Sequence, residues 1–157
     1  MVWGGILGGT KSELILWDKD NWGSITAKSY VDNVLITVLQ PFWMRESERA
    51  GQPPWLMEDG ASAHRAVYTR QAREGYWIPK FDWPRSSPDP NLIENVWYIL
   101  KDMLNKQPVR PQGREAMAEA IREEWQKISE VHLLTFIDSM PQRIEAVLAA
   151  SGGHTRW

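Results

Sequence analysis

Short apolar runs alternate with amphipathic segments along this chain, and this alternation most limits the folds open to it. Val2–Trp3 and Ile6–Leu7 lie among glycines, and the apolar run at 14–17 is bounded by charge. These patterns predict strands joined by a glycine turn. Over 30–39, apolar residues recur every three or four positions, which predicts an amphipathic helix.

The alternation continues through the rest of the chain. Thr26 is the expected N-cap of the first helix and Pro41 its expected end, followed by a loop over 45–54. A buried strand is expected at 55–57, a helix over 62–74 with Gly75 just beyond it, and a strand from Tyr76 toward Trp83. Three prolines mark a loop over 84–90. Further helices are expected at 92–104, 114–128, 131–137 and 141–150. The second of them is net acidic and is expected to be a surface helix that forms only a solvent face.

Mixed strands and helices with short connections predict one α/β layer sandwich. The length of 157 residues suits a single domain, with a core over about 1–107 and a helical extension over about 108–157. Cysteine is absent, which excludes disulfides, thiolate zinc sites and cysteine nucleophiles. No apolar run is long enough to cross a membrane, and no signal peptide is recognisable at Met1. A net charge of −2 argues against a wholly basic nucleic-acid binder.

Two carboxylates stand where α/β proteins commonly place functional groups. Asp59 follows an expected strand, and Glu94 lies in the first turn of the helix after the next strand. Together they could bind a hard divalent cation such as Mg²⁺. Structural alternatives remain open: Asp59 before Gly60 could open a turn, and Glu94 could form a capping box with Asn91.

The motifs around both carboxylates resemble those of mariner-type transposases of the DDE superfamily. The segment 58–64 (EDGASAH) resembles the family's second-aspartate motif, and 82–97 (DWPRSSPDPNLIENVW) resembles its final-carboxylate motif. Between Asp59 and Glu94 lie 34 residues, the separation of the branch that ends in glutamate. The opening Val2-Trp3-Gly4 and the C-terminal segments 138–141 and 152–155 also fit.

The resemblance implies a ribonuclease H-like mixed sheet flanked by helices, with extra C-terminal helices. It implies Mg²⁺- or Mn²⁺-dependent DNA cleavage and strand transfer, with Asp59 and Glu94 as catalytic metal ligands. It implies DNA (transposon ends and target) as the partner and the nucleus as the location, although no clear nuclear localisation signal is present. No membrane and no small-molecule cofactor are expected, and a homodimer is left open.

Two departures from the family pattern affect this expectation. Pro90 and Leu92 are exchanged relative to the usual Asp-Leu-Asn-Pro, which removes a proline suited to starting the helix. The family's first aspartate lies on a strand before Val2-Trp3-Gly4, so the first strand is expected to be missing here. Asp18 and Asp20 would lie two strand spacings, about 10 Å, from that strand, and a turn role is expected for Asp18. The chain alone is therefore expected to be inactive. The alternative is a catalytically dead domesticated or remnant domain that binds DNA or protein.

Several neighbouring residues could support the site. The family motif places a histidine at His64, and Asn95 and Asp89 are further supporting candidates. Local bonding for His64 and turn roles for Asp82 and Asp89 remain alternatives. Glu58 is expected to face away from Asp59 because side chains alternate along a strand. Cations outnumber carboxylates five to two over 64–85, and this excess could contact DNA phosphates. The candidate DNA contacts are Arg65, Arg70, Arg73, Lys80, Trp83 and Arg85.

Overall fold

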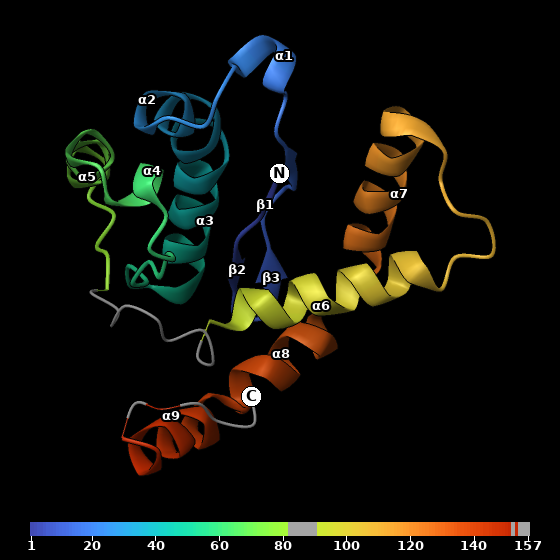
Figure 1. Cartoon of the computed structure of the whole chain (residues 1–157). Coiled ribbons are helices and arrows are strands. Elements are labelled where there is room, and N and C mark those ends of the chain that lie inside the picture. The colour runs from blue at the N-terminus through green and yellow to red at the C-terminus, as the bar shows by residue number, and fades with distance from the viewer. Residues whose placement is uncertain (82–90, 152, 154–157) are drawn as a thin grey trace. The chain divides into compact units, whose positions relative to one another are not determined.

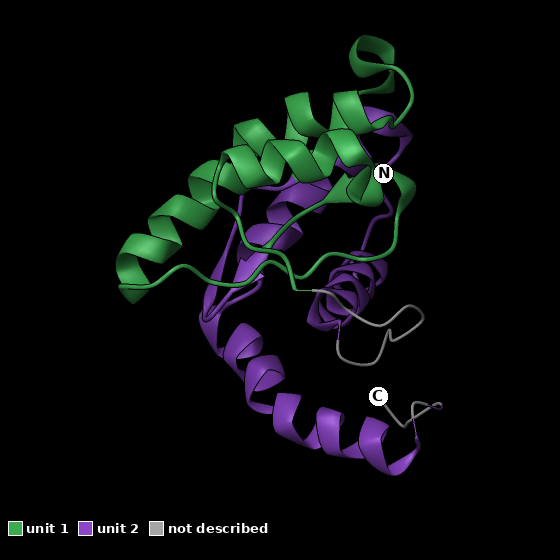
Figure 2. Cartoon of the chain, turned by 90° about the vertical axis from the view of Figure 1, so that its left-hand side faces the viewer, with its two compact units in different colours: residues 1–5, 15–86 green, residues 6–14, 87–157 purple. Residues whose placement is uncertain are grey.

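A computed structural model describes residues 1–81, 91–151 and 153 of the chain (Figure 1). The chain divides into two compact units (Figure 2). Unit 1 comprises Met1–Gly5 and Ile15–Ser86, and unit 2 comprises Ile6–Leu14 and Ser87–Trp157. The boundary expected near residue 107 between a core and a helical extension stays a prediction.

The strands of unit 1 begin where the sequence predicts them. β1 (Val2–Trp3) pairs antiparallel with β4 (Ile15–Leu16), with Val2 opposite Leu16. Asp18 then caps α1 (Lys19–Trp22), where its carboxylate accepts hydrogen bonds from the backbone N–H groups of Asp20 (3.1 Å) and Asn21 (3.3 Å). Asp18 is therefore the N-cap of a short helix rather than the exposed turn residue that the sequence predicted.

A long helical segment supplies most of the core of unit 1. It runs through α2 (Ala27–Tyr30), the π-helical η1 (Val31–Leu39) and α3 (Gln40–Ala50). Thr26 is the N-cap, as expected, and forms a capping box with Ser29. The buried side chains of this segment pack against Ile15, Trp17 and Ala63. The segment itself contributes Tyr30, Val31, Val34, Leu35 and Leu39 to this core.

Pro41 does not end this helix, so the expectation of a helix end there and a loop from residue 45 is wrong. Pro41 lies in the first turn of α3, directly after the π-helical segment. A missing N–H is tolerated in a first turn, whereas it would break the ladder in a helix interior. The helix ends instead at Gly51, which adopts the left-handed conformation at φ 68°.

The helix expected over 62–74 forms as two pieces, α4 (Ser62–Arg65) and α5 (Val67–Gly75). The break falls at Ala66, whose ψ of 145° is extended. The Thr69 hydroxyl donates a hydrogen bond across the break to the Ala63 carbonyl at 2.6 Å. Gly75 is the last helical residue rather than a residue beyond the end, and Trp77 takes the positive φ of 57°.

Two strands were expected between residues 55 and 83, and within the described part of this range, 55–81, a single bridge forms. Leu56 pairs in parallel with Lys80, with hydrogen bonds from Leu56 N–H to Pro79 O and from Phe81 N–H to Leu56 O, both 2.8 Å. Trp55 is 67% exposed, so the buried strand expected at 55–57 is wrong. Each partner contributes one pairing residue, too few to make an extended strand.

In the residues of unit 2 that the structure describes, a hairpin is combined with four helices. β2 (Ile6–Leu7) pairs with β3 (Thr10–Lys11) around Gly8, whose φ is 56°. The helices are α6 (Leu92–Asn105), α7 (Gly113–Lys127), α8 (Glu130–Asp138) and α9 (Met140–Ala149), and they confirm the predicted order. Their core contains Val96, Leu100, Trp125, Ile128 and Leu133.

One face of α7 is buried, contrary to the expectation that this helix is a solvent face. Trp125 is fully buried, lies 5.4 Å from the Trp97 ring and donates its indole N–H to the Ser12 carbonyl at 3.0 Å. Lys11 donates to the carbonyls of Gln126 (3.0 Å) and Ile128 (2.5 Å) at the end of α7. The acidic residues of α7 lie mostly on its other face. Within the described residues, no helix is long and apolar enough to cross a membrane.

Candidate metal-binding site

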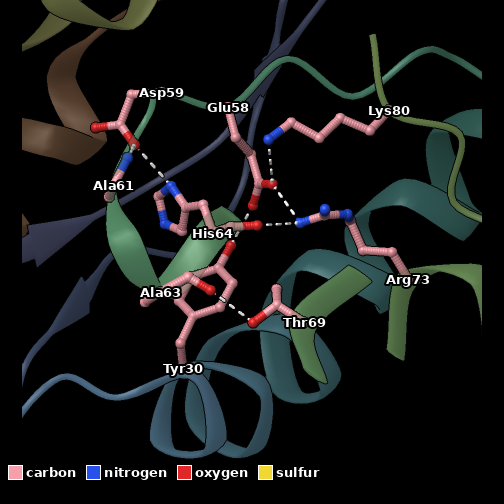
Figure 3. A network of polar contacts seen from close by, with 9 residues as sticks. All are labelled: Tyr30, Glu58, Asp59, Ala61, Ala63, His64, Thr69, Arg73 and Lys80. Atoms are coloured by element: carbon pink, nitrogen blue, oxygen red, sulfur yellow. Dashed lines mark hydrogen bonds and ion pairs between the residues drawn. The ribbon is translucent and has the colours of Figure 1, made fainter. Parts of the chain in front are cut away.

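Asp59 lies three residues after Leu56, the residue that forms the parallel bridge with Lys80. Its side chain is 57% exposed. Its Oδ1 accepts a hydrogen bond from the Ala61 N–H at 3.0 Å, so the turn role left open by the sequence is realised. The same oxygen lies 2.7 Å from Nδ1 of His64. Because an ionised carboxylate only accepts, the imidazole is the donor of that bond. Figure 3 shows the other carboxylate oxygen of Asp59 directed away from these partners.

Glu58 points the opposite way, as expected from the alternation of side chains. Only 5% of its side chain is exposed, and its two oxygens have separate donors. The Tyr30 hydroxyl donates to Oε1 at 2.5 Å, and the Arg73 guanidinium donates to Oε2 at 2.7 Å (Figure 3). The Lys80 ammonium lies 3.6 Å from Oε2. Burial and the neighbouring Glu58 charge raise the pKa of Tyr30 well above its ordinary value, which keeps the donor protonated.

Tyr30 is the member of this cluster that sequence reasoning missed. Its position in the apolar stripe of a helix predicted only a core role. A buried tyrosine hydroxyl usually finds a hydrogen-bond partner, which is the signal that could have identified it. Its ring also packs against His64, with centroids 4.5 Å apart. Tyr30 therefore contacts both Glu58 and the histidine that bonds Asp59.

Glu94 lies in the first turn of α6 and is exposed. Asn91 makes no side-chain capping bond, so the capping box left open as an alternative for Glu94 does not form. Asn95 follows it and is half-buried. Asp59 belongs to unit 1 and Glu94 to unit 2, and their convergence on one metal ion stays a prediction.

The candidate DNA-contacting cations fall into two groups. Arg65 and Arg70 are exposed, and Arg70 lies 3.8 Å from Glu74. The side chains of Arg73 and Lys80 are 6% and 19% exposed and are directed at Glu58. A guanidinium buried in an ion pair does not contact phosphates at the surface, so Arg73 is reassigned to the interior. Asp82, Trp83, Arg85 and Asp89 lie outside the described residues.

The donor chemistry at Asp59 suits a hard divalent cation, because an exposed carboxylate oxygen is the ligand that Mg²⁺ and Mn²⁺ favour. The exposed carboxylate of Glu94 offers the same chemistry. Within residues 1–81, 91–151 and 153, no group of three or more His, Asp or Glu side chains is placed to hold a metal ion. Within the described residues, Asp59 and Glu94 are therefore candidate ligands, and their role stays a prediction.

The α/β fold is that of a ribonuclease H-like transposase catalytic domain. It matches a structure of the Mos1 transposase catalytic domain with raltegravir and Mn at a TM-score of 0.75 and 18% identity, over 99% of this chain and 84% of that chain. A second Mos1 structure, with raltegravir and Mg, matches at a TM-score of 0.71 and 18% identity, over 85% of this chain and 66% of that chain.

The curated relatives are transposases of the Tc1/mariner family, which confirms the resemblance found in the sequence. The chain is 27% identical to the Tc1 transposase of Caenorhabditis elegans over 134 residues, covering 85% of this chain and 47% of that protein. It is 26% identical to the Tcb2 transposase of Caenorhabditis briggsae over 157 residues, covering 100% and 54%. It thus spans about half the length of these relatives. No family model matches the chain.

Proposed function

We propose that this chain forms part of a DNA transposase catalytic domain, in which Asp59 and Glu94 hold the divalent metal ions used for strand cleavage and strand transfer. The observation that carries the proposal is the exposed Asp59 carboxylate, held at one oxygen by Ala61 and His64. The likeness to Tc1/mariner transposases over most of the chain supports it. Transposon ends and target DNA as partners, and action in the nucleus, are parts of the same proposal.

When bound, Mg²⁺ or Mn²⁺ would activate the attacking oxygen and stabilise the leaving oxygen of the phosphodiester. The chain's own residues orient the ligand and bind the substrate. Ala61 and His64 hold one oxygen of Asp59, so the second oxygen keeps a defined direction. Arg65 and Arg70 are exposed cations on α4 and α5 near Asp59 in the sequence and would contact backbone phosphates.

A second candidate function is DNA binding without cleavage. The observation that favours it is that Arg65 of α4 and Arg70 of α5 are exposed. In this case neutralising Arg65 and Arg70 together would make DNA binding less dependent on salt, with the slope reduced by about 0.9 for each phosphate that is no longer neutralised.

The test measures nicking of a labelled DNA duplex by the full chain in Mg²⁺ and in Mn²⁺, alongside its DNA affinity at several salt concentrations. Asp59→Asn is compared with Asp32→Asn, which removes an exposed carboxylate that pairs with Lys28 instead. Nicking that is lost only in Asp59→Asn supports catalysis by this chain. Salt-sensitive binding without nicking favours the DNA-binding module, and an absence of affinity at low salt contradicts both.

A further inference from the structure

The contacts around Glu58 form a buried network next to Asp59, whose carboxylate is exposed (Figure 3). The two residues are consecutive, and only 5% of the Glu58 side chain is exposed against 57% of the Asp59 side chain. Both Glu58 oxygens are occupied, one by the Tyr30 hydroxyl and one by the Arg73 guanidinium. Glu58 therefore joins α2 and α5 at the point where the chain reaches Asp59.

The two partners of Glu58 also contact His64, at different atoms. The same Arg73 nitrogen that pairs with Glu58 donates to the His64 carbonyl at 3.1 Å, which holds the backbone of the short helix α4. The Tyr30 ring packs against the imidazole with a 4.5 Å centroid separation and a 54° angle between the planes. His64 is thus held at its backbone and at its ring, and Glu58 is the shared partner of both contacts.

The imidazole in turn bonds Oδ1 of Asp59 at 2.7 Å. A ligand carboxylate binds a metal ion well when hydrogen bonds fix its orientation beforehand, and such outer partners commonly affect metal affinity by about 10–100-fold. The break between α4 and α5 makes this support necessary. α4 is a single turn, and the Thr69 hydroxyl and Arg73 tie it to α5 through the Ala63 and His64 carbonyls.

The geometry points to Glu58 as a positioning residue for the metal site: through Tyr30 and Arg73 it fixes His64, and His64 fixes the Asp59 carboxylate so that one oxygen remains for a divalent cation. This inference rests on the proposed function, because it takes Asp59 to be a metal ligand. Glu58 itself faces the interior, where Tyr30 and Arg73 occupy its two oxygens.

The experiment titrates Mn²⁺ into the full chain labelled with ¹⁵N and follows paramagnetic broadening of the Ala61 amide, which bonds Asp59. Glu58→Gln removes the ion pair with Arg73 at constant size. Its matched control is Glu46→Gln, since the Glu46 side chain is similarly buried at 6% exposure, belongs to unit 1 and pairs with Arg45 at 3.1 Å. All variants are compared at a temperature where circular dichroism shows each one fully folded.

We expect Glu58→Gln to weaken Mn²⁺ binding by about 10-fold, while Glu46→Gln leaves the Mn²⁺ affinity unchanged. Equal affinities in Glu58→Gln and the unmodified chain would overturn the inference, as would an equal loss in Glu46→Gln. Asp59→Asn separates this failure from failure of the proposed function. If Asp59→Asn leaves the broadening intact, Asp59 is not a ligand and the proposed function fails.

Tyr30→Phe keeps the inference testable if Glu58→Gln does not fold. It removes one hydrogen bond to Glu58 and keeps the ring against His64 and the Glu58–Arg73 pair. A smaller loss of Mn²⁺ affinity than in His64→Ala is expected, because the ring still packs on the imidazole. An unchanged Mn²⁺ affinity in Tyr30→Phe, or a loss as large as that in His64→Ala, would overturn the inference that Tyr30 acts by holding Glu58.

Discussion

Replacing Arg73 with methionine should destabilise unit 1 through a charge left without its partner. The Arg73 and Glu58 side chains are only 6% and 5% exposed, and the nitrogen–oxygen distance is 2.7 Å. Breaking a buried ion pair from one side costs about 3–5 kcal/mol, because the remaining charge stays desolvated. The Lys80 ammonium, 3.6 Å from Glu58, can compensate in part. We therefore expect a loss near the lower limit, about 3 kcal/mol.

For a chain of this size, that loss corresponds to a fall in Tm of about 6–12 °C. The assay is equilibrium unfolding in urea, followed by tryptophan fluorescence and by circular dichroism. Arg45→Met is the control. Its guanidinium also pairs with a buried glutamate but is itself 62% exposed, so a cost below about 1 kcal/mol is expected.

The double variant Arg73→Met with Glu58→Met identifies the cause of the loss. If the cost comes from the unpaired Glu58 carboxylate, removing that carboxylate recovers much of the stability, because an apolar pair can replace a buried ion pair. A cost below about 1 kcal/mol for Arg73→Met would refute the burial argument. A double variant no more stable than Arg73→Met would refute the assignment of the cost to Glu58.

Three further predictions concern unit 2, and Trp55→Ala of unit 1 and Glu130→Ala serve as comparison variants. Trp125→Ala should lower the free energy of unfolding in urea by about 3–5 kcal/mol, because the side chain is fully buried. Trp55→Ala, at a 67% exposed site, should lower it by less than about 0.5 kcal/mol. Similar losses for the two variants would contradict the assignment of Trp125 to the core. Gly9→Ala places a Cβ 2.4 Å from Cγ of Glu130, but that side chain is exposed and can move away, so a cost below about 1 kcal/mol is expected. A larger cost that Glu130→Ala relieves would show that the Glu130 side chain is held in place. A hydrogen bond from Lys127, and to a smaller extent one from Gln107, lowers the pKa of Glu124 from its ordinary value of 4.5. The contribution of Glu124 to folding stability is therefore present above pH 4.5 and is lost as the pH falls through the lowered pKa. Glu124→Gln should therefore lose less stability between pH 6 and pH 3 than the unmodified chain, and parallel losses would rule out this linkage.

The sequence by itself determined the features that depend on near neighbours. Thr26 caps its helix because a hydroxyl before an amphipathic run satisfies the free N–H groups of the first turn. The helices of unit 2 follow from their apolar periodicity. The motifs around Asp59 and Glu94 are sufficient to indicate the transposase resemblance from the sequence. Each of these signals lies within a few residues or within a contiguous motif.

Only the tertiary structure decided the roles of residues whose partners are distant in sequence. Arg73 has the same charge as its exposed neighbour Arg70, and nothing local indicates that it meets Glu58, which lies 15 residues away. Tyr30 and Glu58 are separated by 28 residues, and their bond depends on how α2 packs on α4 and α5. Pro41 is likewise typical of a helix end, yet the helix continues past it. The π-helical segment before Pro41 places it in the first turn of α3, and this segment cannot be predicted from the sequence. An arginine on the surface and an arginine in a buried ion pair have the same side chain and differ only in their surroundings. Those surroundings form only when the helices pack, so the sequence cannot show which arginine is buried.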